Sequence, residues 1–130
     1  MKKEVCVITG GGSGMGLAAA KYMPKEKIIL VTGRTLAKLE RAVTELQEAG
    51  YEAYAKTCDT SVRSQVQELA AYAAELGEIK NVIHAAGLSP AMADPEKLLR
   101  VNALGTVYIN QEFSKYMKAG SVIVDISSNS

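Results

Sequence analysis

The sequence has few of the features that mark secreted, membrane or nucleic-acid-binding chains. After Met1-Lys2-Lys3-Glu4 the apolar run reaches only Ile8, too short for a secretory signal, and no stretch is long enough to span a bilayer. Positive and negative side chains are nearly balanced in number, with 15 Lys and Arg against 14 Asp and Glu. That balance excludes the basic surface with which proteins bind nucleic acid or anionic membranes. We therefore expect a cytoplasmic protein with neither kind of partner.

Cysteine is also scarce, with only Cys6 and Cys58 in the chain. Their spacing is not that of a metal-binding pair. They belong to predicted strands that have a third strand between them. A disulfide rarely joins Cα atoms more than ~7 Å apart, so we expect two buried, unreactive thiols.

No linker, repeat or low-complexity tract interrupts the 130 residues, which predicts a single domain over residues 1–130. Short β-branched runs alternate with longer stretches of helical periodicity. Thr35 is placed to cap one helix, Gly50 follows its end, and Gly77 closes the next helix. Strands are predicted over 5–8, 28–32, 53–56, 81–84 and 121–127, and helices over 14–23, 35–49, 62–76 and 95–118.

This alternation predicts an α/β fold with a doubly wound, Rossmann-like parallel sheet of strand order 3-2-1-4-5. The strands read as almost continuous apolar runs, as expected where helices cover both faces of a sheet. The sequence stops within a few residues of the fifth strand, where such a sheet would normally receive another helix and strand. We therefore expect a fold truncated after strand five.

A glycine-rich segment, Thr9-Gly10-Gly11-Gly12-Ser13-Gly14-Met15-Gly16, leaves the first strand and opens the first helix. A helix N-terminus offers free N–H groups and the positive end of its dipole to a pyrophosphate. Gly10 permits the tight turn, Gly14 lets the backbone approach the phosphates, and Gly16 lets the helix pack on the sheet. No Gly-Lys-Ser/Thr follows, which disfavours a mononucleotide P-loop. The segment predicts a dinucleotide site formed by Gly10, Gly12, Ser13, Gly14, Met15 and Gly16.

The end of the second strand distinguishes between cofactors. A carboxylate normally holds the ribose hydroxyls there, in methyltransferases as well as in NAD enzymes, but Val31-Thr32-Gly33-Arg34-Thr35 contains no acid. The guanidinium of Arg34 can instead bind a 2′-phosphate bidentately. We expect NADP(H) as the cofactor, with NAD as the alternative, and a methyltransferase remains a rival interpretation.

The chain resembles the short-chain dehydrogenases/reductases over essentially its whole length. Thr9-Gly10-x-x-x-Gly14-x-Gly16 is similar to that family's wider-spaced glycine motif, and Cys58-Asp59-Thr60 to its adenine-contacting turn. The resemblance implies that Asp59 accepts from the adenine amino group, with Thr60 beside it. His84-Ala85-Ala86-Gly87 resembles the family's Asn-Asn-Ala-Gly element, with backbone contacts expected from Ala85, Ala86 and Gly87. Asn102 and Ser128 match the family's helix-four asparagine and strand-five serine.

The resemblance implies hydride transfer between nicotinamide and a carbonyl or alcohol carbon of a small-molecule substrate. In the family a tyrosine hydroxyl exchanges the proton and a lysine four residues later lowers its pKa. The serine orients the substrate, and the asparagine supports a water-linked relay. Ser128 and Asn102 are therefore the expected catalytic residues. Tyr-x-x-x-Lys is absent from the 130 residues, so we expect the isolated chain to be inactive.

Two departures from the family pattern concern the residue that ends the fourth predicted strand and the expected oligomeric state. His84 stands where asparagine is usual, and a structural imidazole is the favoured interpretation. Gly87 and Asn102 are fifteen positions apart, a spacing that shortens helix four and favours a homodimer over the family's tetramer. Two functions stay open: the cofactor-binding part of an NAD(P)(H)-dependent oxidoreductase, or a non-catalytic module that senses the cofactor.

Overall fold

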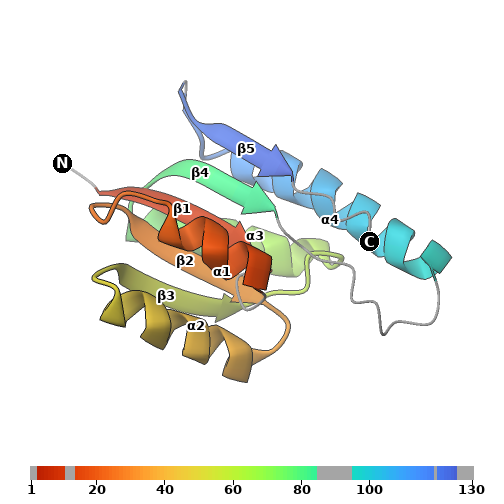
Figure 1. Cartoon of the computed structure of the whole chain (residues 1–130). Helices are drawn as coiled ribbons and strands as arrows, with labels where there is room; N and C mark the ends of the chain where they lie inside the picture. The colour runs from red at the N-terminus through yellow and green to blue at the C-terminus, as the bar shows by residue number, and fades with distance from the viewer. Residues whose placement is uncertain (1–2, 11–13, 85–94, 119, 126–130) are drawn as a thin grey trace.

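The computed structural model describes residues 3–10, 14–84, 95–118 and 120–125, which form a five-stranded parallel sheet flanked by helices (Figure 1). The strand order is β3-β2-β1-β4-β5, so the predicted order 3-2-1-4-5 is confirmed. The elements are β1 (Glu4–Thr9), α1 (Gly14–Lys21), β2 (Ile28–Gly33), α2 (Leu36–Glu48), β3 (Glu52–Thr57), α3 (Arg63–Leu76), β4 (Glu78–His84), α4 (Pro95–Ser114) and β5 (Val122–Asp125).

Every predicted strand and helix is present, and the differences lie at their ends. β4 begins at Glu78 rather than at residue 81, because Glu78 and Ile79 pair with Glu4 and Val5 of β1. α4 ends at Ser114, before the predicted end at residue 118. Thr35 occupies the N-cap position of α2, but its side chain makes no capping hydrogen bond, so that expectation was wrong. Gly77 closes α3 as predicted.

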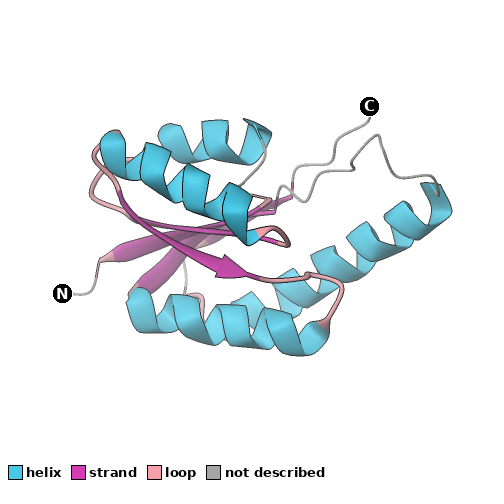
Figure 2. Ribbon diagram, turned by 90° about the horizontal axis from the view of Figure 1, so that it is seen from below, coloured by secondary structure: helices cyan, strands magenta, loops and turns pink. Residues whose placement is uncertain are grey.

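Helices lie on both faces of the sheet (Figure 2), and one apolar core lies under the helices of each face. Successive side chains of a strand point to opposite faces. Val5 and Val7 of β1 therefore join the core under α3 and α4, while Cys6 and Ile8 join the core under α1 and α2. Because β1 is buried on both sides, its sequence is an unbroken apolar run.

Both cysteines are free and buried. Cys6 lies in β1 and Cys58 directly after β3, with β2 between those strands, as expected. Burial raises the pKa of the Cys6 thiol to about 12 and that of the Cys58 thiol to about 11. Since the thiolate is the reactive form, both thiols are unreactive near neutral pH.

Candidate functional site: the carboxyl edge of the sheet

The carboxyl ends of β1 and β4 form the point at which the fold changes direction. The chain leaves β1 toward α1 on one face, whereas α4, which follows β4, packs on the other face with α3 (Figures 1 and 2). In open α/β sheets, ligands bind in the crevice outside such a switch point. The predicted glycine segment begins here.

Gly10 follows the last residue of β1 with a φ of 70°, in the left-handed region that favours glycine. Helix α1 then begins at Gly14, and Gly16 is buried in its first turn. Residues 11–13 lie outside the described residues, as do the side chains of residues 14 and 15. The described part is thus a positive-φ turn that leads from a buried strand into a helix N-terminus, the arrangement that a pyrophosphate requires.

A row of polar side chains crosses the sheet beside this turn. Thr9 pairs in register with Thr32 of β2 on one side and with His84 of β4 on the other. Thr9 Oγ1 and His84 Nδ1 are 2.7 Å apart, a hydrogen bond whose donor depends on the imidazole tautomer. The buried hydroxyl of Thr32 lies beside the Cys58 thiol and has no oxygen or nitrogen partner in the part of the chain that the structure describes.

Asp59 is held in a tight turn after β3. Its Oδ1 accepts hydrogen bonds from the backbone N–H of Ser61 at 3.0 Å and from the Ser61 hydroxyl at 2.6 Å. The Asp59 backbone N–H donates to Gln65 Oε1 at 2.8 Å. The Ser61 hydroxyl, aided by the charge of Arg34, lowers the pKa of Asp59, so the carboxylate is ionised at neutral pH and acts only as an acceptor.

Arg34 lies at the carboxyl end of β2 with its side chain exposed. Within the described ranges the guanidinium makes no hydrogen bond or ion pair, although it lies close enough to Asp59 to lower the pKa of that carboxyl. The two charges therefore border the same edge of the sheet. Arg34 remains available to bind an anion from solvent.

Helix α4 approaches this edge at Gly105. A Cβ placed on Gly105 would lie 2.7 Å from Thr60 Oγ1 and 3.6 Å from His84 Cε1. The absence of a side chain thus lets α4 pack against both the turn after β3 and the end of β4. Asn102 lies one turn earlier in α4, and its side chain is outside the described part.

The structure brings part of the predicted site together. Gly10, Arg34, Asp59 and Thr60 lie at the carboxyl ends of β1, β2 and β3, and α1 begins at Gly14. The remaining predicted residues fall outside the described ranges: Gly12, Ser13, Ala85, Ala86, Gly87 and Ser128. In the ranges described, no group of His, Cys, Asp and Glu is placed to hold a metal ion. Nor is any helix of this part long and apolar enough to cross a bilayer.

The sequence did not reveal three contacts of this edge: the Thr9–His84 hydrogen bond, the close approach at Gly105, and the support of Asp59 by Ser61 and Gln65. The first two join residues that are far apart in the chain and depend on strand register. A signal for the first was present, because Thr9, Thr32 and His84 each end an apolar run with a polar residue. The Ser61 contact follows a known turn pattern of aspartate, in which the side chain bonds the backbone two residues on.

Comparison with known proteins shows which family this chain is similar to. The family model described as short chain dehydrogenase matches residues 4–130. Short-chain dehydrogenase/reductase bsc3 of Alternaria brassicicola is 32% identical over 128 residues, which cover 98% of this chain and 46% of that protein. The chain thus spans about half the length of the curated relatives it matches.

Solved structures agree with this result. A variant of actinorhodin polyketide ketoreductase, crystallised with NADPH, has 29% identity and a TM-score of 0.80, covering 97% of this chain and 53% of that one. An alcohol dehydrogenase from the archaeon Thermococcus sibiricus, complexed with 5-hydroxy-NADP, has 27% identity and a TM-score of 0.80, covering 94% and 57%. An NAD⁺-bound xylitol dehydrogenase has 25% identity and a TM-score of 0.82, covering 94% and 52%.

Proposed function

This chain belongs to the short chain dehydrogenase family, and we propose that it forms the NADP(H)-binding part of an oxidoreductase. The reaction is hydride transfer between the nicotinamide ring and the carbonyl or alcohol carbon of a small molecule. When bound, the cofactor supplies or accepts the hydride, and the residues of this chain bind and orient it.

The observation that carries the proposal is the turn at Gly10. Its φ of 70° follows a buried strand and leads to a helix N-terminus at the switch point of the sheet. A pyrophosphate placed there receives backbone N–H groups and the positive end of the α1 dipole. Gly12, Ser13, Gly14, Met15 and Gly16 complete this cradle in the proposal, and Ala85, Ala86 and Gly87 border it after β4.

Asp59 and Thr60 are proposed to hold the adenine end. Asp59 Oδ1 is already occupied by Ser61, while Oδ2 makes no hydrogen bond in the described part of the chain. The ionised carboxylate therefore retains an acceptor for the exocyclic amino group of adenine. Thr60 is fixed beside it by the packing of α4 at Gly105.

Arg34 is proposed to select NADP(H) over NAD(H). It is exposed, carries no ion pair among the described residues, and has no acid next to it in Thr32-Gly33-Arg34-Thr35. A guanidinium can bind the 2′-phosphate of NADP(H) with two parallel hydrogen bonds. The NADPH-bound and NAD⁺-bound relatives both share the fold, so the fold alone does not distinguish the two cofactors.

Titration of Arg34→Asp with NADPH and NADH tests this role. We expect NADPH affinity to fall by roughly 10- to 100-fold, since a charge-assisted bond contributes about 1.5–3 kcal/mol. NADH affinity should change little or rise. Lys38→Asp, an exposed cation on α2, serves as the matched control and should leave the ratio of the two affinities unchanged. Equal NADPH affinity in wild type and Arg34→Asp would contradict the proposal.

Ser128 and Asn102 are proposed as the catalytic residues that this chain contributes. The serine hydroxyl would orient the substrate oxygen, and the asparagine would support a proton relay. None of the six tyrosines is followed by a lysine four residues later. The 130-residue polypeptide therefore lacks the proton-exchanging pair, and we expect it to bind cofactor without turning it over.

Two assays test this expectation and separate the two open functions. A steady-state assay of NADPH oxidation with aldehydes and ketones should show no turnover above the uncatalysed rate. Turnover on any carbonyl would contradict the predicted inactivity of these residues. If the same polypeptide, extended with a Tyr-x-x-x-Lys segment of a relative, remains inactive while still binding NADPH, a cofactor-sensing module becomes the better interpretation.

We also propose that the protein is cytoplasmic and forms a homodimer through α4. Two large apolar side chains on this helix are exposed, Leu104 by 38% and Val107 by 47%. Exposed apolar side chains of this size on one helix face favour burial against a partner.

A further inference from the structure

We propose that His84 is a positioning residue that holds the cofactor turn at Gly10 in place and couples it to the adenine turn at Thr60. The inference rests on the proposed cofactor site. It concerns a residue that the family resemblance marks only as a departure, and to which the sequence assigned a purely structural role.

The first contact joins His84 to the glycine turn. Thr9 Oγ1 and His84 Nδ1 are 2.7 Å apart and come from adjacent strands, at positions that pair in register. Thr9 is 1% exposed and His84 4% exposed. A buried hydrogen bond of this kind is costly to break, because the group left behind loses its partner without regaining water. The contact therefore fixes the residue that directly precedes Gly10.

The second contact joins the imidazole to α4. His84 Cε1 is 3.6 Å from the position of a Cβ on Gly105, and the same Cβ would lie 2.7 Å from Thr60 Oγ1. A side chain at this position of α4 would thus meet both the imidazole of β4 and the turn after β3, so all three elements converge at Gly105. Thr9, His84, Gly105 and Thr60 form a continuous packed set that links the phosphate end of the proposed site to its adenine end.

The neighbouring strand shows that such a hydrogen bond is not needed to build this edge of the sheet. Thr32 pairs in register with Thr9 on the other side and is fully buried, and its hydroxyl has no oxygen or nitrogen partner among the described residues. The two threonines at the same level of adjacent strands therefore differ in their partners: Thr9 is bonded to His84, whereas the Thr32 hydroxyl lies beside the Cys58 thiol. Only Thr9 also precedes the glycine turn.

The experiment compares isosteric variants of these two threonines in the 130-residue chain. NADPH dissociation constants are measured by calorimetric titration for wild type, Thr9→Val and Thr32→Val. We expect Thr9→Val to weaken NADPH binding about tenfold, the value of one buried hydrogen bond. Thr32→Val should leave the dissociation constant unchanged. Equal dissociation constants for Thr9→Val and Thr32→Val, in folded proteins, would overturn the proposal.

Variants of His84 distinguish positioning from simple packing. His84→Leu removes the ring nitrogen and should weaken NADPH binding about tenfold, whereas His84→Asn should restore affinity to within about threefold of wild type. The amide oxygen of Asn can accept from the Thr9 hydroxyl near the position of Nδ1. The double variant Thr9→Val/His84→Leu should bind no more weakly than His84→Leu alone, because His84→Leu already removes the bond that Thr9→Val removes. Failure of His84→Asn to restore binding would contradict the proposal.

A spectroscopic measurement tests the Thr9–His84 contact independently of cofactor binding, and therefore independently of the proposed function. His84 is the only histidine in the chain, so its ring nitrogens are identified in a long-range ¹H–¹⁵N spectrum without assignment. Thr9→Val should shift the Nδ1 resonance and Thr32→Val should not. If this holds but wild type binds no nicotinamide cofactor, the proposed function fails while the contact stands. If His84→Leu does not fold, Thr9→Val alone decides the proposal.

Discussion

Gly77 is the residue at which α3 ends and β4 begins, directly beside the start of β1. A Cβ at this position would lie 2.3 Å from the backbone oxygen of Lys3 and 3.1 Å from Cγ2 of Val5. The next residue, Glu78, donates its backbone N–H to the same Lys3 oxygen at 2.9 Å. The missing side chain therefore lets β4 join β1 at the first rung of their ladder.

Gly77→Ala should consequently destabilise the fold. The added methyl group meets backbone atoms that cannot rotate away, and overpacking of this kind costs about 1–3 kcal/mol. Urea unfolding followed by circular dichroism measures the loss. Gly33→Ala is the matched control, because its Cβ would meet only Leu39 Cδ2 at an ordinary 3.5 Å. A loss no larger than that of the control would contradict the account of Gly77.

Single residues also show where sequence reasoning succeeds. Gly10 was predicted from its place between a strand and a helix, and its φ of 70° confirms the turn. The place of Arg34 directly after the second strand was also predicted, since β2 ends at Gly33. The Thr9–His84 bond spans 75 positions and was not predicted. Its existence depends on the register of β1 against β4, which no local pattern specifies.

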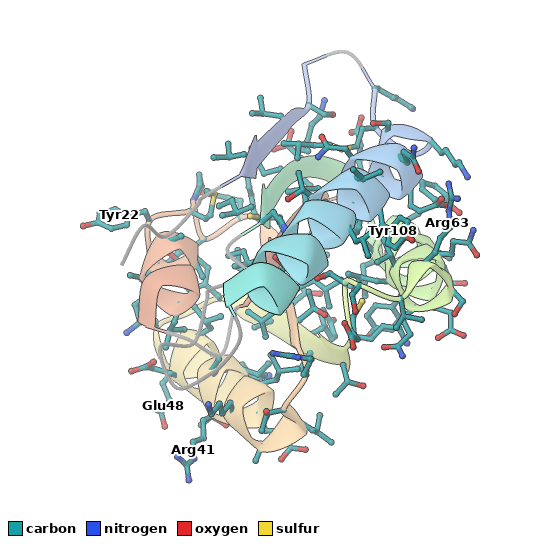
Figure 3. All side chains as sticks on the ribbon, turned by 90° about the vertical axis from the view of Figure 1, so that its right-hand side faces the viewer. Tyr22, Arg41, Glu48, Arg63 and Tyr108 are labelled. Carbon is teal, nitrogen blue, oxygen red and sulfur yellow. The ribbon has the colours of Figure 1, made fainter. Side chains whose placement is uncertain are left out.

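Helices α3 and α4 are joined by a small charged cluster around Glu112. The side chain of Glu112 is 4% exposed, and its carboxylate accepts from Lys115 Nζ at 3.0 Å and from Arg63 Nε at 3.3 Å. Arg63 also donates to Gln111 Oε1. Its guanidinium lies over the ring of Tyr108, and Figure 3 shows these two side chains next to each other. Because Arg63 opens α3, Glu112 belongs to α4 and Lys115 directly follows that helix, the cluster fixes the relative placement of the two helices.

This cluster predicts a pH-dependent stability. The hydrogen bond from Lys115, followed by that from Arg63, lowers the pKa of Glu112 below its ordinary value of 4.5. A depressed carboxyl pKa adds stability that is present above the ordinary value and lost as the pH falls through the folded-state value. Wild type should therefore exceed Glu112→Gln in urea midpoint at pH 7, and the difference should shrink below pH 4.5.

Glu48→Gln provides the control for this measurement. Glu48 lies on the exposed side of α2 and forms no ion pair among the residues that the structure describes (Figure 3). The difference in urea midpoint between Glu48→Gln and wild type should stay constant over the same pH range. A Glu112→Gln difference that is equally flat would show that the carboxylate contributes nothing to the packing of α3 on α4.

The presence and type of each helix and strand were predicted more accurately than its first and last residues. The five apolar runs and four helical stretches sufficed for the fold, because parallel strands buried on both faces leave a strong apolar signal. β4 was predicted too short because its first half, Glu78-Ile79-Lys80, reads as polar. Pairing with β1 extends it, and Lys80 reaches Glu78 in an ion pair at 3.5 Å. Tertiary pairing outside the local window sets this boundary.

At the scale of the molecule, the described residues offer two apolar surfaces as candidate sites of self-association. One is the α4 surface, with Leu104 and Val107; the other is the β5 surface, with Val122 and Val124, which are 50% and 45% exposed. β5 is an edge of the sheet that the described residues form. An edge strand presents unpaired backbone groups and can recruit further strands. A helix face that meets its own copy buries the same patch on both subunits and closes after two.

The proposed homodimer therefore depends on α4 and not on β5. Sedimentation velocity over a range of concentrations should show a dimer for wild type and a monomer for Val107→Lys, since a buried lysine without a partner opposes association. Val124→Lys is the matched control. It should keep the dimer and reduce larger aggregates, because a charge on an edge strand blocks strand addition. A dimer that persists in Val107→Lys but disappears in Val124→Lys would transfer the interface from the helix to the sheet edge.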